Sequence, residues 1–393
     1  MGSAVGAPSI VRRTDLLDRV HQIGSAIVAP AADAVDRDAR FPREAIEALR
    51  AERLLGALIP TELGGLGLDF PLIAAICEAL GQYCASAAMV YAMHQIQVSC
   101  VVRHSEGSPF WRHYLQDLAA REGLIASATS EIGVGGDVRS SVCAVERDGD
   151  RFTLAKQAPV ISYGEHADEY LITARRTPAS PPNDQVLVLA RRAETTLERT
   201  SGWDTLGFRG TCSLGFRLRA TGDAGQILPA PFADISSQTM LPVSHILWSS
   251  LWTGIAVSAV RRARSFVRSD ARKSAGTVPA SALRAAELVS ALQTMRSNVH
   301  ECARDYAATM DDVERLGALR FAIRMNNLKI AASMAVVDIV GQALLICGMS
   351  GYKADSPYSL GRHLRDAYGA MLMINNDRIT AASASMLLVS KDE

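Results

Sequence analysis

The chain has 393 residues, 48% of them hydrophobic, and its 41 lysine and arginine residues balance 41 acidic residues. This length predicts about two or three domains with large apolar cores, and the zero net charge argues against binding to nucleic acid or to an anionic membrane. Seven cysteines without C-x-x-C spacing argue against a disulfide framework and against a structural metal site, and they favour a protein of the reducing cytoplasm.

The first third of the sequence has apolar residues at helical spacing and predicts a helical domain over residues 1–122. Pro42 suits the start of a helix, and a turn-rich passage at 54–68 interrupts the pattern. No secretory apolar region follows the small residues 1–10, so a soluble protein is expected. The predicted helices span residues 15–35, 42–52, 71–103 and 108–121.

After residue 122 the pattern changes to short runs bounded by glycine, proline, aspartate and asparagine. Such runs predict strands spaced as in a β-sandwich or barrel, and hence a middle β domain over residues 123–230. The predicted strands span residues 125–129, 141–146, 151–156, 169–174, 185–190 and 213–218.

Long helical patterns return beyond residue 230 and predict a C-terminal four-helix bundle over residues 231–393, which makes the fold class α+β. Two stretches, 244–260 and 330–350, are apolar enough to be tested as membrane spans. Polar residues inside them, such as His245 and Asp338, favour buried bundle helices instead. The predicted helices span residues 244–273, 280–310, 316–347 and 365–389.

Residues 127–141 read S-A-T-S-E-I-G-V-G-G-D-V-R-S-S and join the helical first third to the predicted strands. Gly133, Gly135 and Gly136 would let backbone N–H groups approach a flat or phosphorylated ligand without obstruction by side chains. An ordinary turn leading into strands explains a glycine cluster equally well. The loop is therefore a candidate binding site whose chemistry depends on its neighbours.

The order of helices, β domain and bundle resembles the acyl-CoA dehydrogenase superfamily over nearly the whole chain. Members carry a T-E-P-G-A-G-S-D loop at the entry to the β domain, and residues 130–137 match this loop. The resemblance implies that Ser127 and Ser130 grip the flavin, with Ser130 at the position of the flavin-contacting threonine. Gly136 stands where the family has a serine that contacts the thioester substrate, so this substrate-binding position differs.

Two further runs resemble elements that hold the cofactor FAD in this family. Residues 156–164 match a K-x-W-I-T-N-G run, which implies that Ser162 lies beside the flavin, although a strand-end hydroxyl satisfied by the backbone would look the same. Arg272 and Ser274 match an R-x-x-F-G element that reaches the FAD of a neighbouring subunit. A solvated arginine at a helix end is the alternative for Arg272.

Gly348 and Gly351 match the G-G-x-G-[FY] turn that holds the adenosine part of FAD across a subunit boundary. The alternative is a plain glycine turn that ends a helix. The resemblance at Arg272 and at these glycines implies at least a homodimer, or a homotetramer.

The family's catalytic base positions are not acidic here. In its dehydrogenases the pair R-D is followed at a fixed spacing by a glutamate that removes the substrate α-proton, and counting from Arg365 reaches Ile374 or Asn375. Neither side chain accepts a proton at a useful pH. Other members carry the glutamate early in the first bundle helix, where residues 241–255 contain no acidic residue and His245 is the titratable group. His245 would then face the substrate, or would pack or cap the helix.

Asp377 would supply the base if the local match shifts by two residues, which makes Asp377 and Asn375 candidate catalytic residues. Asp377 would otherwise pair with Arg378 or cap a helix turn. Removal of the α-proton without a placed base would forfeit about 3 to 5 kcal/mol of barrier lowering.

A branch of the superfamily uses reduced flavin and oxygen to oxygenate its substrate, and this chemistry needs a polar pocket rather than a carboxylate. His94 lies on the helix that lines the substrate pocket in this fold, and with Tyr91 and Gln95 it would orient a substrate oxygen. A histidine in this helix also serves packing alone.

Three functions follow from the resemblance. The first is a flavin-dependent oxygenase that acts on an acyl thioester or on an aromatic or heterocyclic substrate and receives reduced flavin from a reductase. The second is a dehydrogenase of an acyl-CoA or acyl-carrier-protein thioester that passes electrons to an electron-transferring flavoprotein. The third is a non-catalytic assembly partner, against which the retained serine and arginine positions argue.

Overall fold

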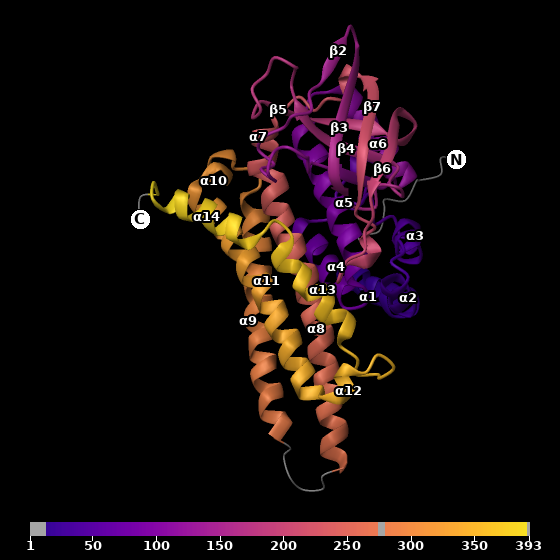
Figure 1. Cartoon of the computed structure of the whole chain (residues 1–393), viewed down its shortest axis with the longest axis vertical. Helices are drawn as coiled ribbons and strands as arrows, with labels where there is room; N and C mark the ends of the chain where they lie inside the picture. The colour runs from indigo at the N-terminus through magenta and orange to yellow at the C-terminus, as the bar shows by residue number, and fades with distance from the viewer. Residues whose placement is uncertain (1–12, 274–279, 391–393) are drawn as a thin grey trace, which may run out of the picture.

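The computed structural model describes residues 13–273 and 280–390. Figure 1 shows two β-sheets at one end of the molecule, the N-terminal helices beside them, and long bundle helices that extend away from the sheets. The predicted fold class, helices followed by a β domain and a helical bundle, is confirmed.

The N-terminal segment is helical, with breaks that the apolar periodicity does not predict. The predicted helix 15–35 contains a π-helical turn, and the predicted helix 71–103 is two helices separated at 82–84. The first of these ends at Gly81, where α8 crosses so closely that a Cβ on Gly81 would lie 2.3 Å from the carbonyl oxygen of Leu251. The helices are α1 (Arg13–Ile23), η1 (Gly24–Val28), α2 (Ala29–Arg37), α3 (Arg43–Ala51), η2 (Thr61–Leu63), α4 (Phe70–Gly81), α5 (Ala85–His104) and α6 (Pro109–Arg121).

The middle segment forms two sheets, in the strand orders β1-β4-β5 and β2-β3-β7-β6. Strands β1 and β4 are parallel, and the other pairs are antiparallel. The strands are β1 (Ile125–Ala128), β2 (Glu146–Asp148), β3 (Arg151–Ile161), β4 (Glu169–Arg175), β5 (Gln185–Arg191), β6 (Thr195–Ser201) and β7 (Leu214–Asp223). The short helices η3 (Arg192–Glu194), η4 (Arg209–Thr211) and η5 (Ala224–Gln226) connect them.

Strands β4 and β5 are buried on both faces, which explains their continuous apolar sequences. Leu171 and Leu187 pack with side chains of α6, whereas Ile172 and Val188 face the core shared with the second sheet. Two strand predictions are wrong in detail. Residues 141–146 make one bridge before β2 begins at Glu146, and the polar edge strand β6 is absent from the predicted set.

The bundle consists of α8, α9, α11 and α13, with α14 turned away from it near the sheets (Figure 1). The predicted last helix, 365–389, is therefore two helices with a break at 373–375. The helices are α7 (Phe232–Ile235), η6 (Ser236–Met240), α8 (Leu241–Lys273), α9 (Ala280–Thr309), α10 (Val313–Gly317), α11 (Leu319–Cys347), α12 (Met349–Tyr352), α13 (Gly361–Leu372) and α14 (Asn376–Leu387).

Among the described residues, three helices are long and apolar enough to cross a membrane by length and composition. The windows in Ala85–His104 and Phe232–Arg272 are 89% and 94% buried, so the predicted burial of 244–260 is confirmed. The window in Leu319–Cys347 is 44% buried. The prediction that 330–350 is a buried helix is therefore wrong for its outer face, which carries exposed side chains such as Leu345.

Side chains from distant segments tie the three parts of the chain together. The buried carboxylate of Asp366 on α13 accepts a hydrogen bond from the Phe208 amide at 2.7 Å. The neighbouring Arg365 donates from Nη1 to Oδ1 of Asp36 on α2 at 3.0 Å. These contacts place α13 against both the β domain and the N-terminal helices.

Candidate functional site

One buried carboxylate holds the two ends of the glycine loop together. Glu131, at the start of the loop, accepts hydrogen bonds from the Ser141 hydroxyl and from the Cys143 amide, each at 2.6 Å. The ammonium of Lys156 on β3 lies 3.4 Å from Glu131, and both side chains are buried. Burial lowers the pKa of Lys156, and the Glu131 charge opposes this shift. The loop is thus a fixed element of the β domain.

The serines predicted to contact the flavin lie at the ends of β1 and β3 and are half-buried. Ser127 Oγ lies 3.4 Å from Thr129 Oγ1, and Ser162 Oγ lies 2.8 Å from Ser213 Oγ. Ser130 follows β1 directly at the start of the loop. The two strands are joined where the Tyr163 hydroxyl donates to the carbonyl of Ile125 at 2.9 Å. The structure therefore brings these serines to one region of the β domain.

Gly136 is covered by an arginine from the last helix. Arg378 on α14 donates hydrogen bonds to the carbonyl oxygens of Gly136 and of Gly135, the latter at 2.6 Å. Both glycines have left-handed backbones, with φ of +58° at Gly135 and +78° at Gly136. A Cβ on Gly136 would lie 2.4 Å from Arg378 Nη1. The serine that the family resemblance leads one to expect at position 136 has no room while Arg378 lies there.

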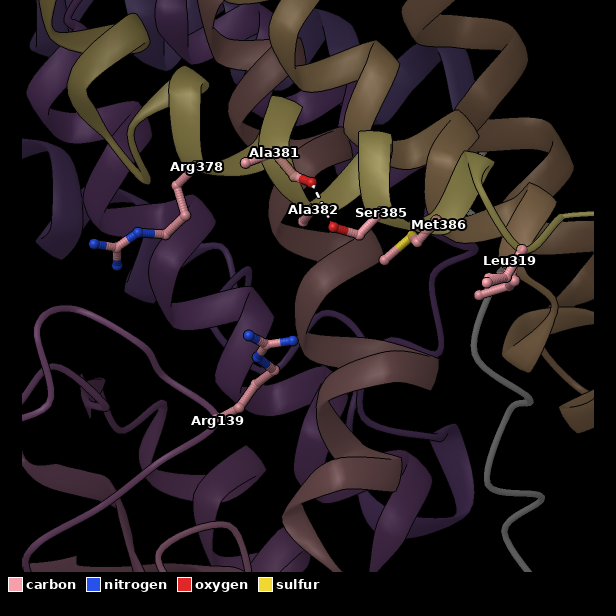
Figure 2. A pocket seen from close by; sticks show the side chains of 8 residues that line it. Arg139, Leu319, Arg378, Ala381, Ala382, Ser385 and Met386 are labelled. Carbon is pink, nitrogen blue, oxygen red and sulfur yellow. Dashed lines mark hydrogen bonds between the residues drawn. The ribbon is translucent and has the colours of Figure 1, made fainter.

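A cavity of about 440 Å³ opens beside this contact (Figure 2). Its walls are mostly apolar side chains of α14, and the guanidinium groups of Arg139 and Arg378 lie at its edge. Arg139 forms an ion pair with Asp137 at 3.0 Å and lowers the pKa of that carboxyl. The cavity is lined by Arg139, Leu319, Arg378, Ala381, Ala382, Ser385, Met386 and Val389.

The turn between α13 and α14 carries the residues predicted at the catalytic base position. Ile374 is exposed and has a left-handed backbone with φ of +44°. Asn375 caps α14, because its side-chain oxygen accepts a hydrogen bond from the Asp377 amide at 2.8 Å. Asp377 is exposed on the first turn of α14, next to Arg378. The turn therefore lies close to the glycine loop.

His94 links three segments of the chain and has no free ring nitrogen. Nε2 lies 2.9 Å from the carbonyl oxygen of Leu55, and Nδ1 accepts a hydrogen bond from the Ile125 amide at 3.1 Å. Burial lowers the pKa of His94 to about 4, so the ring is neutral at pH 7. In this arrangement the residue positions the start of β1 and is not available to orient a substrate, which differs from its predicted catalytic role.

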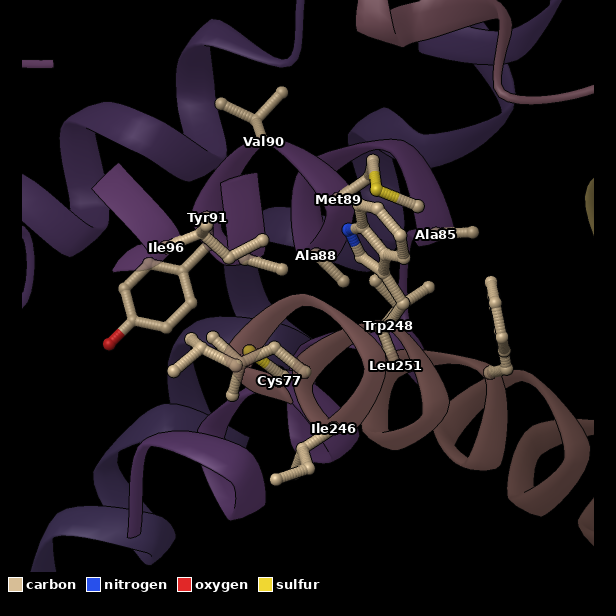
Figure 3. Packing of buried hydrophobic residues seen from close by; sticks show 14 of the residues in the cluster. Cys77, Ala85, Ala88, Met89, Val90, Tyr91, Ile96, Ile246, Trp248 and Leu251 are labelled. Carbon is tan, nitrogen blue, oxygen red and sulfur yellow. The ribbon is translucent and has the colours of Figure 1, made fainter. Parts of the chain in front are cut away.

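The other polar residues predicted at the substrate pocket lie on α5 and α8, and Figure 3 shows Tyr91 among buried side chains of this region. Tyr91 Oη and Gln95 Oε1 on α5 are buried without a hydrogen-bond partner among the described residues. On α8, His245 Nδ1 donates to the carbonyl of Met325 at 3.1 Å, which leaves Nε2 as a buried acceptor without a partner in the same part of the chain. Burial lowers the pKa of His245 to about 4.

Further polar atoms of α8 are buried without a hydrogen-bond partner among the described residues, namely Trp248 Nε1, Ser249 Oγ and Trp252 Nε1. A buried polar group without a partner costs about 1–3 kcal/mol. A bound water or a polar ligand would relieve this cost.

The predicted contacts of FAD with a second subunit lie far from the glycine loop. The end of α8, which carries the exposed Arg272, and helix α12 lie at the end of the bundle away from the sheets (Figure 1). Gly348 has φ of +54° at the turn between α11 and α12, and Gly351 lies within α12. Ser274 lies outside the described residues. One chain alone does not bring these residues to the loop.

The residues around the loop fit a flavin by their chemistry. Half-buried hydroxyls at Ser127, Ser130 and Ser162 supply hydrogen-bond donors for a polar ring edge. Val142 and Val160, which flank this region in sequence, keep 59% and 37% of their surface exposed. Exposed apolar side chains beside polar donors suit a flat aromatic ring with a polar edge.

Two residues of this region were missed by reasoning from sequence. Arg378 had been considered only as a partner for Asp377. Lys329 on α11 is fully buried and donates to the carbonyl of Ile374 at 2.8 Å and to Asn376 Oδ1 at 2.7 Å. The signal that could have found Lys329 is that it is the one lysine of the α11 sequence, at the start of a long apolar run.

Models of two domains of one protein family match this chain. The acyl-CoA dehydrogenase N-terminal domain matches residues 12–122, and the acyl-CoA dehydrogenase C-terminal domain matches residues 236–374. A cyclohex-1-ene-1-carbonyl-CoA dehydrogenase from Syntrophus aciditrophicus is 24% identical over 93% of this chain and 87% of that protein. The amino sugar nitrososynthase DnmZ of Streptomyces peucetius is 23% identical, over 89% of this chain and 87% of that one.

Among solved structures, FMN-bound TdsC from Paenibacillus sp. A11-2 superimposes with a TM-score of 0.83 and 19% identity. The match covers 96% of this chain and 98% of that chain. TdsC is a dibenzothiophene monooxygenase. At this identity the likeness shows the fold.

Proposed function

Because this chain belongs to the acyl-CoA dehydrogenase family of flavoproteins, we propose that it is a flavin-dependent oxygenase that acts on an acyl thioester or on an aromatic or heterocyclic substrate. The observation that carries the proposal is the turn between α13 and α14. The resemblance puts the family's base position at Ile374 or Asn375, and here Ile374 is an exposed alkyl side chain while the side chain of Asn375 caps α14.

The second base position offers no acid either. On α8, His245 is buried and its pKa is lowered to about 4, so the ring binds a proton weakly. A general base must take the α-proton efficiently near the working pH, and its loss removes about 3 to 5 kcal/mol of barrier lowering. Oxygenation does not require this step, which is why it agrees better with these side chains than α,β-dehydrogenation does.

We assign FAD as the flavin, to be held by the hydroxyls of Ser127, Ser130 and Ser162. When bound and reduced by two electrons, the flavin would let O₂ deliver one oxygen atom to the substrate while the other leaves as water. The unpartnered atoms of Tyr91 and His245 would orient the substrate, and the apolar contacts between α5 and α8 would exclude water.

The expected partners follow from this chemistry. A separate flavin reductase would supply the electrons, and a homodimer or homotetramer would complete the FAD site through Arg272. We expect the protein in the cytoplasm, because its seven cysteines are unpaired thiols. The relatives TdsC, a monooxygenase, and DnmZ, a nitrososynthase, support oxygen chemistry on this fold.

Dehydrogenation of a thioester is the second candidate, because the 24% identical relative is a cyclohex-1-ene-1-carbonyl-CoA dehydrogenase. Asp377 would then be the base, since it lies in the same helical turn as Arg378, which contacts the glycine loop. A non-catalytic role as an assembly partner would apply if no flavin binds.

The deciding experiment supplies purified, flavin-loaded protein with candidate thioesters and aromatic substrates under two conditions. With a flavin reductase and oxygen, an oxygenase yields a product heavier by one oxygen atom, and labelled O₂ provides that atom. Without oxygen, bleaching of the oxidised flavin by a thioester would instead identify a dehydrogenase. Asp377→Asn should keep full oxygenase activity, and protein that takes up no flavin would rule out both enzyme functions.

A further inference from the structure

Lys329 is a fully buried lysine, and its hydrogen-bond partners in the described part of the chain are a carbonyl and a side-chain amide oxygen, not a carboxylate. Its ammonium donates to the carbonyl oxygen of Ile374 at 2.8 Å and to Asn376 Oδ1 at 2.7 Å, and it lies 5.9 Å from the ring centroid of Trp252. Burial lowers its pKa to about 8. An unpaired buried charge is unfavourable unless hydrogen bonds compensate for the lost contact with water. For the Lys329 ammonium, the hydrogen bonds to Ile374 and Asn376 provide this compensation.

The turn that Lys329 contacts is strained and is also held from a second position on α11. Ile374 is β-branched and has φ of +44°, a left-handed conformation that is unfavourable for such a residue. The side-chain Nδ2 of Asn376 donates to Ser333 Oγ at 3.1 Å, and Ser333 lies one helical turn after Lys329. Such a backbone persists only where its surroundings hold it.

The turn at 374–376 also determines where α14 begins. Asn375 caps this helix, and Arg378 in its first turn donates to the carbonyl oxygens of Gly135 and Gly136. A continuous series of contacts therefore runs from Lys329 through residues 374–376 to the glycine loop.

We propose that Lys329 is a positioning residue of the flavin site, because its ammonium holds the turn 374–376 and thereby keeps Arg378 on the glycine loop. The inference rests on the proposed function, since the loop matters for catalysis only when flavin and substrate bind beside it. Lys329 acts through the backbone of the turn.

The test compares Lys329→Met with the wild-type protein, both without added substrate. Methionine keeps the length of the side chain and removes the buried charge, so we expect a melting temperature equal to or above that of the wild type. Backbone amide hydrogen exchange should nevertheless become about tenfold faster at residues 374–378 and 133–137. Lys353→Met, at an exposed lysine beside α12, is the matched control and should change neither segment.

A second variant approaches the same contact from the turn. Asn376→Ala removes the acceptor of the Lys329 hydrogen bond and should speed exchange in the same two segments. Combined with Lys329→Met it should add little, because both changes break one link. If Lys329→Met does not fold, the exchange pattern of Asn376→Ala carries the test.

Unchanged exchange at 133–137 in both variants would overturn the proposal. Faster exchange spread over the whole chain together with a lower melting temperature would also overturn it, because that pattern indicates general destabilisation. The flavin absorbance of the wild-type protein tests the proposed function separately. A colourless wild-type protein would refute that function, while the exchange comparison would still decide the role of Lys329.

Discussion

At the scale of single residues, the contact with Arg378 explains why position 136 is a glycine. The family resemblance places a substrate-contacting serine at position 136, but the guanidinium of Arg378 occupies the space of any side chain there. The arginine instead donates to the carbonyl oxygens of Gly135 and Gly136. The loop is therefore contacted by a residue 243 positions away in sequence.

We expect Arg378→Met to loosen the glycine loop. Each lost hydrogen bond to a carbonyl is worth about 0.5–1.5 kcal/mol, and somewhat more from a charged donor, so trypsin should cut after Arg139 about tenfold faster. Global stability should fall by about 1–3 kcal/mol, which is the sum of the two lost hydrogen bonds. Glu314→Gln, an exposed change in α10, is the control. Equal cleavage rates in Arg378→Met and the wild type would contradict the role of this contact.

Two buried histidines predict how stability depends on pH. Burial lowers the pKa of His94 and of His245 from 6.5 to about 4. The unfolded chain then binds more protons between these values, so the unfolding free energy is fully present above pH 6.5 and falls as the pH falls toward 4. Each histidine contributes on the order of 3 kcal/mol to this loss.

Urea unfolding at several pH values measures the effect. His94→Gln should flatten the decrease between pH 6.5 and 4 while lowering stability at pH 7, because glutamine cannot make both hydrogen bonds of the ring. Gln116→Ala, at an exposed glutamine of α6, is the control and should leave the slope unchanged. An unaltered slope in His94→Gln would mean that His94 takes up its proton without unfolding.

At the scale of elements, the glycine loop depends on the buried pair Glu131 and Lys156. We expect Glu131→Gln to destabilise the protein by about 3–5 kcal/mol, because it leaves the Lys156 charge buried and unpaired. Glu198→Gln, in the exposed pair with Arg217, should cost less than about 1 kcal/mol. Urea midpoints would decide, and a similar small change in both variants would contradict the importance of the buried pair.

Long helices and buried strands were predictable because their apolar periodicity reflects local geometry. The break at 82–84 was not predictable from the sequence, because it depends on a tertiary contact. There, α4 ends where Gly81 meets the backbone of α8. Strand β6 was missed because a polar edge strand has no apolar alternation. The break at 373–375 was not predictable either, because the Lys329 that donates to the carbonyl oxygen of Ile374 there lies 45 residues earlier in the sequence.

Of the candidate site, too, the sequence predicts the parts that lie in short contiguous runs and not those that depend on tertiary contacts. The glycine loop and the serines at 127, 130 and 162 could be found from motifs, because short contiguous runs carry them. The hydrogen bonds of His94, Arg378 and Lys329 could not be predicted. Each joins segments that are far apart in the sequence, and no local sequence pattern indicates that they meet.

At the scale of the whole molecule, α11 to α13 present an apolar surface that a monomer leaves in water. Its exposed side chains include Leu345, Met349, Tyr352 and Leu372, which are between 63% and 74% exposed. Large exposed apolar side chains on neighbouring helices favour an interaction site, and a second copy of the chain is the partner that the proposed FAD site would need.

Leu345→Glu should therefore shift the protein toward monomers in size-exclusion chromatography with light scattering, because it places a charge in an apolar interface. The flavin should then bind more weakly. Leu206→Glu, at a leucine that is 61% exposed in the β domain, is the matched control and should keep the wild-type mass. An oligomer that survives Leu345→Glu would place the interface elsewhere.

The ion pair between Arg365 and Asp36 has a consequence for synthesis on the ribosome. Its partners are 329 residues apart, so at roughly 5–20 residues per second the nascent N-terminal helices wait roughly 15 to 65 seconds for α13 to emerge. During that time Asp36 has no arginine from α13, and the surface of α2 that Arg365 will contact is open to chaperones or to other nascent chains. Premature termination shortly before residue 365 would make this exposure permanent, so late truncations should be cleared by quality control even though most of the sequence is present.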